Sequence, residues 1–470
     1  MGKIFDFSCN KRVVSNKIVN GGCHGDAPPG RTAGNRNISQ MRNKETGRQS
    51  EASPKMIDRI TVLGGSSVYI PEFIASVINH NLPVREIVLQ GRAGKKLDTV
   101  RAFCNRLADR AGFPVKITPE TDVEAAVTGA KYIINHVRVG GMKARMRDEM
   151  LPPQFNLLGS EQLGAGAVTN ALRTLPVCLE HARIIECVNP GAVVINMTNP
   201  VGIMVEALSR RTGLNVIGVC DLPRLYTRKL ASLLGIDPVL LTVDYVGLYH
   251  LGWIQDVKVD GRSRMNQLLE ILEAREEEDF DYDLIELFRM IPTRETGMFF
   301  HRAEVLKKQQ NCARFRAEVL YEAEQQILRM YENPHLNAIP DLTRQRNAGW
   351  YEETIMPLIQ GFEGKTDTST VVCVPNRGSI RDLADDSSVE VPALVNCQGV
   401  KPRKVGMLPR FLRGMFSATK ESERLAIEAV LNKSFDYALQ ALAVNPFVDS
   451  IQRARKYLEK VTKLEPLDLH

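Results

Sequence analysis

The sequence predicts an α/β protein built around a mostly parallel sheet with helices on both faces. From Ile57 to about residue 252, apolar runs rich in Val and Ile alternate with segments of helical character. The first run ends in a turn of small residues, Gly64-Gly65-Ser66-Ser67, directly before a helical segment. A strand, a small-residue turn and a helix in this order are typical of a Rossmann-like nucleotide-binding region.

The expected elements follow one another along this part of the chain. The first strand begins at Ile57 and the first helix near Pro71, because proline is well placed in the first turn of a helix. A second helix is expected over residues 96–111. We expect the later strands at residues 86–89, 115–117, 132–137, 192–198 and 215–220.

The pattern changes after Gly252. Long charged helices are expected there, such as residues 300–332. Residues 371–395 have a strand-like composition, and helices return from Lys420 to the end. The apolar stripe of the expected helix over residues 300–332 comprises Leu306, Phe315, Val319, Leu320 and Ile327.

We therefore divide the chain into three regions. Residues 1–55 are rich in Gly, Asn, Ser, Arg and Lys and are expected to form a disordered basic extension. Residues 56–252 are the Rossmann-like, dinucleotide-binding region, and residues 253–470 are an α+β region for substrate binding and oligomerisation. No linker separates the last two, so we expect them to pack as one compact unit.

The composition excludes several classes of partner. The extension holds ten of the 61 Lys and Arg and four of the 55 Asp and Glu, which leaves 51 residues of each sign in the rest. The folded part has no basic bias, so we expect no nucleic-acid partner. No apolar run approaches the roughly 20 residues of a membrane span, so we expect no membrane partner. Nine cysteines without CxxC spacing favour a reducing, cytoplasmic location.

Two short segments carry the strongest candidate site. Cys220 lies in Gly-Val-Cys-Asp-Leu-Pro at 218–223, and His250 lies in Gly-Leu-Tyr-His-Leu-Gly-Trp at 247–253. Each segment follows an apolar, β-branched run, so we expect both side chains at the carboxyl ends of strands. A Cys and a His together can form half of a divalent-metal site with positions open for substrate. Taken singly, each also fits a buried structural role.

The small-residue turn is the candidate cofactor site. Gly64, Gly65, Ser66 and Ser67 can let the backbone approach a pyrophosphate at a helix N-terminus, although an ordinary tight turn has the same composition. After the second strand, where an acidic residue would bind ribose hydroxyls, the sequence is Gln90-Gly91-Arg92. Arg92 can instead meet a 2′-phosphate, so the sequence leaves NAD and NADP open.

Other polar residues stand at turns and strand ends. Arg145 follows a Gly-Gly turn and suits bidentate binding of a phosphate or carboxylate, or an ion pair with Glu149. Glu161 precedes a Gly-rich turn and can orient sugar hydroxyls. Asn199 precedes a proline and fits either a turn or a ligand contact. Tyr351, taken alone, fits an ordinary half-buried tyrosine.

Six motifs in one order resemble a known family. They are Gly-Gly-Ser-Ser-Val-Tyr-Ile-Pro-Glu at 64–72, Arg-Val-Gly-Gly-Met-Lys-Ala-Arg-Met-Arg-Asp-Glu at 138–149, Asn-Met-Thr-Asn-Pro-Val-Gly at 196–202, Cys-Asp-Leu-Pro at 220–223, Gly-Leu-Tyr-His-Leu at 247–251 and Leu-Ala-Asp-Asp-Ser-Ser-Val-Glu-Val-Pro at 383–392. In this order they resemble glycoside hydrolase family 4, the NAD- and metal-dependent phosphoglycosidases, and most of all its 6-phospho-β-glucosidases. The resemblance covers the chain from about Ile57 to the C-terminal helices.

The resemblance implies a lactate/malate-dehydrogenase-type Rossmann region and a hydrolysis outside the two-carboxylate scheme. NAD⁺ takes the hydride from C3 of the sugar. A divalent metal such as Mn²⁺ polarises the resulting ketone and acidifies the C2 proton, which a tyrosine removes. The aglycone then leaves C1 by elimination, water adds, and NADH returns the hydride. The resemblance also implies a homodimer or homotetramer.

The resemblance assigns roles near the reacting carbons. Cys220 and His250 look like the metal ligands. Tyr351 looks like the C2 base, which needs a nearby cation to lower its pKa. Asp221 is the candidate acid for the leaving group. It stands where many β-specific members have Asn and α-specific members have Asp, so the anomer stays open.

The resemblance also assigns contacts to the substrate. Arg145 looks like a 6-phosphate contact, and Arg346 like a further phosphate or substrate contact. Glu161 and Asn199 resemble the family's contacts to substrate hydroxyls. A phosphorylated β-glucoside is the leading expectation. A phosphorylated α-glucoside and a glycoside without phosphate are the alternatives within the family.

Two departures from the family pattern leave other functions open. Tyr249 replaces the Asn that usually precedes the metal histidine, and Gln90-Gly91 replaces the cofactor-binding Asp. Either departure could mean an altered substrate or a protein that binds sugar phosphate or nucleotide without turnover. A lactate- or malate-type dehydrogenase is disfavoured, because the chain has no Gly-His-Gly-Asp-like segment.

Overall fold

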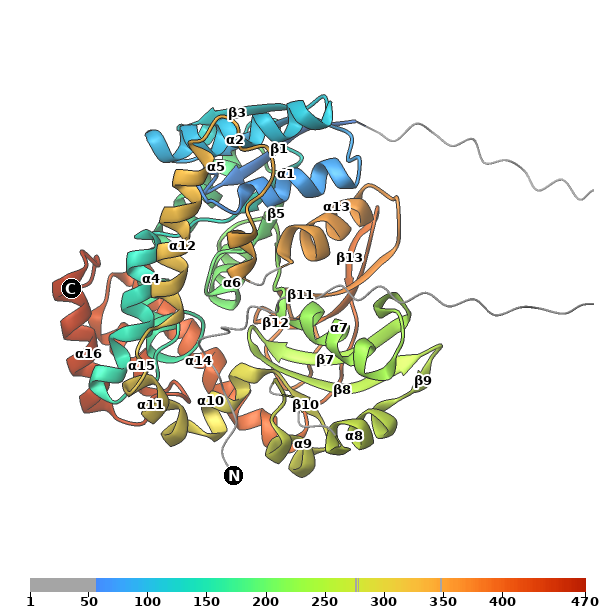
Figure 1. Ribbon diagram of the computed structural model, residues 1–470. Helices are drawn as coiled ribbons and strands as arrows, with labels where there is room; N and C mark the ends of the chain where they lie inside the picture. The colour runs from blue at the N-terminus through green and yellow to red at the C-terminus, as the bar shows by residue number, and fades with distance from the viewer. Residues whose placement is uncertain (1–55, 275–276, 278, 347–348) are drawn as a thin grey trace, which may run out of the picture.

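The computed structural model describes residues 56–470 apart from 275–276, 278 and 347–348 (Figure 1). The expected disordered extension, residues 1–55, lies outside the described residues. Within the described part, no helix is both long and apolar enough to cross a bilayer.

Six parallel strands form the first part of one sheet. They stand in the order β3-β2-β1-β4-β5-β6, which is the 3-2-1-4-5-6 order of a Rossmann fold. This order confirms the predicted Rossmann-like fold. The strands are β1 (Ile57–Leu63), β2 (Val84–Gln90), β3 (Lys116–Glu120), β4 (Tyr132–Asn135), β5 (Val193–Asn196) and β6 (Asn215–Gly218).

Helices cover both faces of these strands. In β4, Tyr132 and Ile134 belong to one buried apolar cluster and Ile133 to another, so neither face of the strand meets solvent. The first helix has Pro71 in its first turn, as predicted. The helices of this part are α1 (Ile70–Asn79), α2 (Lys95–Ala111), α3 (Val123–Val127), α4 (Gly141–Met150), α5 (Gly164–Val188) and α6 (Val201–Arg211).

The sheet continues beyond β6 with antiparallel strands. β11 (Thr368–Pro375) pairs with both β6 and β12 (Ser388–Asn396). β12 pairs in turn with β7 (Leu241–Leu248), and β7 forms a hairpin with β8 (Leu251–Val259). The strand order therefore places β11 and β12 between β6 and β7, although they come more than a hundred residues later. One sheet runs through both halves of the chain, and the division at residue 252 stays a prediction.

The prediction of a single helix over residues 300–332 is wrong. The structure has two helices, α11 (Arg302–Gln310) and α12 (Arg316–Tyr331), with an irregular segment between them. The N–H of Phe315 donates to Glu318 Oε2 at 2.7 Å, an arrangement that starts a new helix at this point. α12 packs against α4 and α2, so a helix of the second half closes over the Rossmann-like half (Figure 1).

The C-terminal helices pack beside α5. The first of them begins at Arg410, earlier than the expected Lys420, directly after Pro409. The remaining helices are α7 (Leu222–Leu234), α8 (Met265–Ala274), α9 (Tyr282–Phe288), α10 (Gly297–Phe300), α13 (Met356–Phe362), α14 (Arg410–Asn432), α15 (Phe435–Ala443) and α16 (Ile451–Leu464). The remaining strands are β9 (Arg262–Ser263), β10 (Ile291–Pro292) and β13 (Gly399–Pro402).

Candidate active site

The turn after β1 requires its glycines. Gly64 has φ +88°, and a Cβ there would lie 2.4 Å from the carbonyl oxygen of His136. A Cβ on Gly65 would lie 2.7 Å from the Cα of Leu89. Any side chain would therefore push the turn away from the ends of β2 and β4.

A cavity of about 380 Å³, the turn pocket, lies over this turn. Gly64, Ser66 and Ser67 line it together with Gln90 and Arg92 at the end of β2. Gly65 does not line the cavity and lies against β2. The pocket lies at the carboxyl edge of the sheet, where Rossmann folds bind dinucleotides. The structure thus brings the predicted cofactor-binding residues together.

The turn pocket is basic. Its charged lining has five Lys and Arg and one acidic side chain among the described residues. This excess suits a ligand with several negative charges, such as a pyrophosphate. The charged lining residues are Arg92, Lys96, Arg138, Arg145, Arg346 and Glu324.

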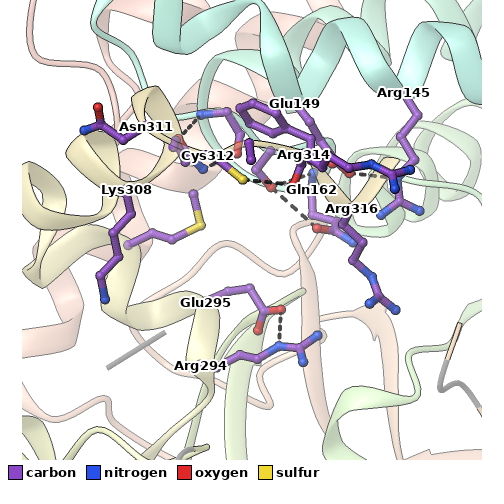
Figure 2. A pocket seen from close by; sticks show the side chains of 16 residues that line it. Arg145, Glu149, Gln162, Arg294, Glu295, Lys308, Asn311, Cys312, Arg314 and Arg316 are labelled. Carbon is purple, nitrogen blue, oxygen red and sulfur yellow. Dashed lines mark hydrogen bonds and ion pairs between the residues drawn. The ribbon is translucent and has the colours of Figure 1, made fainter. Parts of the chain in front are cut away.

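A second cavity, of about 560 Å³, is here called the basic pocket. Arg145 of α4 lines both cavities, so the two are neighbours. Figure 2 shows Arg294 and Arg316 pointing into the basic pocket from different segments of the second half. Its acidic lining residues are Glu149 and Glu295.

Arg316 has the weakest charge compensation in the basic pocket. Its side chain donates to the carbonyl oxygen of Arg346 at 2.7 Å, and no ion pair joins it to a carboxylate within the described part. Burial, Arg145 and Arg294 all lower the pKa of Arg316, because three cations lie close together. A bound phosphate would offset this repulsion.

Three neighbouring side chains bind the carboxylate of Glu161. Its side chain is 1% exposed and forms ion pairs with Arg138 and with Arg145, the latter at 3.1 Å. It also accepts a hydrogen bond from Asn199 Nδ2 at 3.0 Å. Burial alone would raise the pKa of Glu161, but Arg138 and Arg145 outweigh it and lower the pKa to about 2. Glu161 is therefore an ionised anchor that holds two arginines and an amide beside the turn pocket.

Both polar atoms of the Asn199 side-chain amide form hydrogen bonds. The hydroxyl of Tyr249 donates to Asn199 Oδ1 at 2.5 Å, while Nδ2 donates to Glu161. Tyr249 is buried, and its ring centroid lies 4.4 Å from that of His250. Nδ2 carries a second hydrogen, for which the described residues offer no further acceptor.

Cys220 and His250 come together from two different strand ends, as predicted. Cys220 follows β6, and His250 lies in the turn between β7 and β8. Cys220 Sγ lies 3.6 Å from His250 Nε2. His250 has φ +63°, an unfavourable conformation for a residue other than glycine, and Thr293 Oγ1 donates to its carbonyl oxygen at 2.8 Å. The fold thus holds the imidazole against the thiol.

Acidic groups surround this pair. Glu295 Oε1 lies 3.4 Å from His250 Nδ1. Burial alone would lower the pKa of His250, but Glu295 outweighs it and raises the pKa. Glu390 of β12 is also close enough to act on both Cys220 and His250, and its Oε2 accepts a 2.6 Å hydrogen bond from Tyr245. Burial raises the pKa of Glu390 to about 7.

The Cys220–His250 pair fits a divalent metal. A thiolate sulfur and an imidazole nitrogen are both metal ligands, and at a separation of 3.6 Å the two atoms could contact one ion. Burial, Glu390 and Asp221 all raise the pKa of Cys220, so a nearby cation is needed to hold it as a thiolate. Glu295 Oε2 is buried without a hydrogen-bond partner in the described part. A buried thiol and imidazole with carboxylates beside them are suited to a cation.

Tyr351 lies apart from the lining of both cavities. It belongs to a π-helical turn, Trp350–Ile355, and is 2% exposed. Its hydroxyl lies 2.9 Å from His136 Nδ1, beside the turn pocket. Arg346 lies over the rings of Tyr69 and Trp350, at 4.4 and 3.7 Å from their centroids. The structure therefore places Tyr351 and Arg346 by the turn pocket, and their reaction roles stay predictions.

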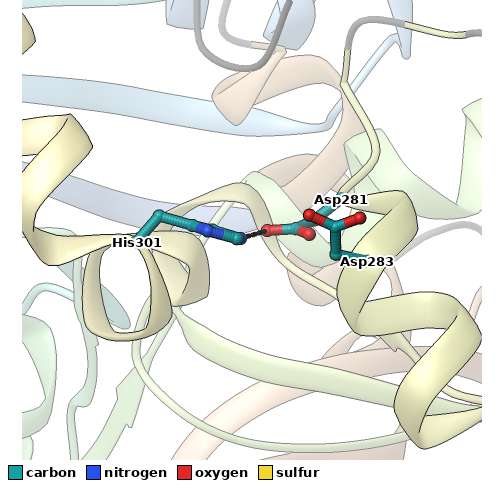
Figure 3. Close-up of side chains that lie close together, drawn as sticks. All are labelled: Asp281, Asp283 and His301. Atoms are coloured by element: carbon teal, nitrogen blue, oxygen red, sulfur yellow. Dashed lines mark hydrogen bonds and ion pairs between the residues drawn. The ribbon is translucent and has the colours of Figure 1, made fainter. Parts of the chain in front are cut away.

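A three-residue acidic and histidine cluster lies elsewhere. Asp281, Asp283 and His301 are the group of three potential ligands within the described residues (Figure 3). Asp281 Oδ1 accepts from the N–H of Leu284 at 3.2 Å at the start of α9, and its Oδ2 pairs with His301 Nε2 at 2.9 Å. Helix capping and this ion pair account for the cluster without a metal.

Sequence reasoning missed several residues of the site. Arg294, Glu295 and Arg316 lie in segments without motif character, and only the folded chain brings them to the basic pocket. His136 is expected inside the strand over residues 132–137, whereas β4 ends at Asn135 and His136 lies beyond it. Glu390 lies inside a motif, where it alternates with valines as in an ordinary strand. This pattern does not indicate that Glu390 lies near Cys220.

Fold and site together define a Rossmann-type α/β protein with two adjoining basic cavities beside a buried Cys–His pair. The model described as "Family 4 glycosyl hydrolase" matches residues 59–236, and "Family 4 glycosyl hydrolase C-terminal domain" matches residues 245–448. The chain belongs to family 4 of the glycosyl hydrolases, a family of glycosidases, as its motifs predicted.

Relatives in this family carry two kinds of name. The chain is 31% identical over 421 residues to the "Probable 6-phospho-beta-glucosidase" of Bacillus subtilis, covering 86% of this chain and 95% of the relative. It is 26% identical over 427 residues to the phospho-alpha-glucosidase PagL of Clostridium acetobutylicum, covering 85% and 96%. The solved 6-phospho-beta glucosidase of Thermotoga maritima with manganese, NAD⁺ and glucose-6-phosphate has a TM-score of 0.80 and 28% identity, covering 87% and 99%.

Proposed function

We propose that the chain hydrolyses 6-phospho-β-glucosides by C3 oxidation, C2 deprotonation, elimination of the aglycone, water addition and re-reduction. The named 6-phospho-beta-glucosidases among its relatives support the substrate class. The observation that carries the proposal is Arg145, which lines both the turn pocket and the basic pocket. A sugar phosphate in the basic pocket would therefore lie next to a dinucleotide in the turn pocket.

The bound cofactors are a nicotinamide dinucleotide and a divalent cation, with Mn²⁺ as the leading choice. When bound, the dinucleotide takes and returns the hydride, and the cation polarises the sugar ketone. Gly64, Ser66 and Ser67 would hold the dinucleotide, with Gly65 fixing the turn. Cys220 and His250 would hold the cation and leave its other positions to the sugar oxygens.

The 6-phosphate would be held by the basic pocket. Arg145 is already paired with Glu149 and Glu161, whereas Arg316 has no carboxylate partner in the described part of the chain. We therefore assign the phosphate to Arg316 together with Arg145. Asn199, whose second amide hydrogen has no further acceptor among the described residues, would donate to a sugar hydroxyl, while Glu161 positions both Asn199 and Arg145.

Tyr351 is the proposed C2 base, and His136 its partner. Burial raises the pKa of Tyr351, which opposes its action as a base. Burial, Arg346 and Arg138 all lower the pKa of His136, so its imidazole is neutral. A neutral Nδ1 at 2.9 Å accepts a hydrogen bond from the Tyr351 hydroxyl and positions its oxygen. Arg346 lowers the pKa of Tyr351 against the effect of burial, so it is the cation that would favour the phenolate that takes the C2 proton.

The α-anomer is the second candidate substrate. Asp221 follows Cys220 directly and can serve as an acid for the leaving group, and a phospho-alpha-glucosidase is among the relatives. An assay with p-nitrophenyl 6-phospho-β- and 6-phospho-α-glucosides, each with NAD⁺, Mn²⁺ and a reductant, decides between them. We expect faster turnover of the β-substrate. Turnover of neither, despite bound cofactor, would make the protein a binder without activity.

The proposal also covers the oligomeric state and the cellular location of the protein. A homodimer or homotetramer is expected from the family resemblance, and light scattering on a size-exclusion column measures it. A cytoplasmic location is proposed because the seven cysteines in the described part are all free, as is typical of reducing compartments.

A further inference from the structure

We propose that the end of β2 is a subsite for a 2′-phosphate, so that this chain binds the 2′-phosphorylated dinucleotide more tightly than the unphosphorylated one. The inference rests on the proposed function, because it takes the turn pocket as the dinucleotide site. It concerns the adenosine ribose, which lies away from the reacting sugar.

The end of β2 lies where the ribose of a bound dinucleotide would lie. The N–H groups of Gly64 and Gly65 donate to the carbonyl oxygen of Gln90 at 3.0 and 2.7 Å, so the strand end contacts the turn. In Rossmann folds an acidic residue at this strand end accepts hydrogen bonds from the ribose hydroxyls. Here the residue is Gln90, whose Nε2 donates to the carbonyl oxygen of Thr121 at 3.2 Å. The strand end therefore presents no carboxylate to a ribose.

The residues that follow supply positive charge instead. Arg92 lines the turn pocket, is exposed, and has no hydrogen-bond or ion-pair partner among the described residues. Lys96 lines the same pocket one turn further on. α2 begins at Lys95 without a side-chain cap, so its first N–H groups add to the positive end of this site. A phosphate dianion matches a free guanidinium and uncapped N–H groups.

Glu324 is the competing feature. This residue of α12 is the acidic residue in the described lining of the turn pocket, and it could accept from ribose hydroxyls in place of the missing strand-end carboxylate. It forms an ion pair with Lys96, however, so its charge is already compensated. Arg92 has no such partner. The uncompensated charge at the β2 end is positive, which favours the phosphate.

The test uses the full chain and two half-ligands that differ only at the ribose. 2′,5′-ADP and 5′-AMP are titrated by calorimetry, followed by NADP⁺ and NAD⁺. We expect 2′,5′-ADP to bind about tenfold or more tightly than 5′-AMP, because a charged hydrogen bond contributes about 1.5–3 kcal/mol. Arg92→Ala should remove most of this difference and leave 5′-AMP unchanged. Arg85→Ala, an exposed arginine earlier in β2, is the matched control and should change neither.

Each other outcome overturns the inference. If 5′-AMP binds as tightly as 2′,5′-ADP, or more tightly, the site does not bind the 2′-phosphate. Equal weakening of both ligands in Arg92→Ala assigns Arg92 to the part that they share. Weaker 5′-AMP binding in Glu324→Gln, with no preference for 2′,5′-ADP in the parent, assigns the ribose to Glu324. If none of the four nucleotides binds, the proposed function fails at its cofactor and the inference falls with it.

Discussion

The hydroxyl of Tyr249 donates a hydrogen bond of 2.5 Å to the side-chain oxygen of Asn199. This bond fixes the orientation of the amide, because Asn199 Nδ2 donates at the same time to Glu161. The residue that departs from the family pattern is thus tied to a predicted substrate contact. Its ring also packs against His250, so one side chain touches both the candidate metal ligand and the candidate sugar contact.

Tyr249→Phe should keep the ring packing and release the amide. We expect the free energy of unfolding to fall by about 1–3 kcal/mol, because Asn199 Oδ1 is left buried without a donor. Urea unfolding measures this change, and Tyr437→Phe, on the exposed side of α15, is the control. We also expect KM for the phosphoglucoside to rise with a smaller change in kcat. An unchanged unfolding free energy together with an unchanged KM would show that the bond has no role.

Cys220→Ser tests the metal assignment. Loss of the thiolate should weaken Mn²⁺ binding by at least about 100-fold, since changes to outer-shell partners alone cost 10–100-fold. Calorimetric titration of Mn²⁺ into the chain gives the affinity without reference to turnover. Cys397→Ser, at an exposed cysteine, should bind Mn²⁺ like the parent. Parent-like Mn²⁺ affinity in Cys220→Ser would refute Cys220 as a ligand.

Tyr351→Phe tests the base. Loss of a positioned base should lower kcat by about 10²–10⁴-fold, with little change in the binding of glucose-6-phosphate. His136→Gln should lower kcat less than Tyr351→Phe does, because the phenol oxygen then loses the imidazole that positions it. A large effect of Tyr351→Phe on folding, seen as a lower melting temperature, would point to a structural role instead. A parent-like kcat in His136→Gln would show that His136 does not position Tyr351.

Acid should destabilise the protein partly through Glu161. Its folded-state pKa is about 2, against about 4.3 for an ordinary glutamate, so the folded protein binds fewer protons than the unfolded one. The resulting stability is fully present above pH ~4.3 and is lost as the pH falls towards about 2. Melting temperature should therefore drop between about pH 5 and 2.

Glu161→Gln should change that acid dependence. The variant is expected to be less stable at pH 7, because Arg138 and Arg145 lose a buried partner, and to show a smaller further drop in acid. Glu286→Gln, at an exposed position of α9, is the matched control and should follow the parent. A drop in Glu161→Gln as large as in the parent would place the acid sensitivity elsewhere.

The Rossmann-like half was predictable because its signals are local. β1, β2, β4, β5 and β6 are short, largely buried runs rich in β-branched residues. The turn at Gly64 has the small residues that the close approach of β2 and β4 requires. The pairing of β11 and β12 between β6 and β7 has no such signal, since it joins segments far apart in the chain. The break between α11 and α12 was missed because Phe315 continues the apolar spacing while it precedes the new helix.

The candidate site was predictable only in part, for a related reason. Cys220 and His250 follow strands and could be expected at one edge of a sheet, and the structure places them 3.6 Å apart. Arg316 and Glu295 carry no pattern of their own. Arg316 and Glu295 reach the site because α12 and the segment after β10 pack over the Rossmann-like half. The spacing of residues in the sequence does not show this packing.

Elimination after loss of the C2 proton distinguishes the proposed reaction from direct displacement at C1. Hydrolysis of p-nitrophenyl 6-phospho-β-glucoside in D₂O, with NAD⁺ and Mn²⁺, separates the two. We expect one solvent deuterium at C2 of the glucose-6-phosphate formed, read by NMR or mass spectrometry, and no turnover once the metal is chelated. Turnover with hydrogen retained at C2 would rule out the elimination and indicate direct displacement at C1.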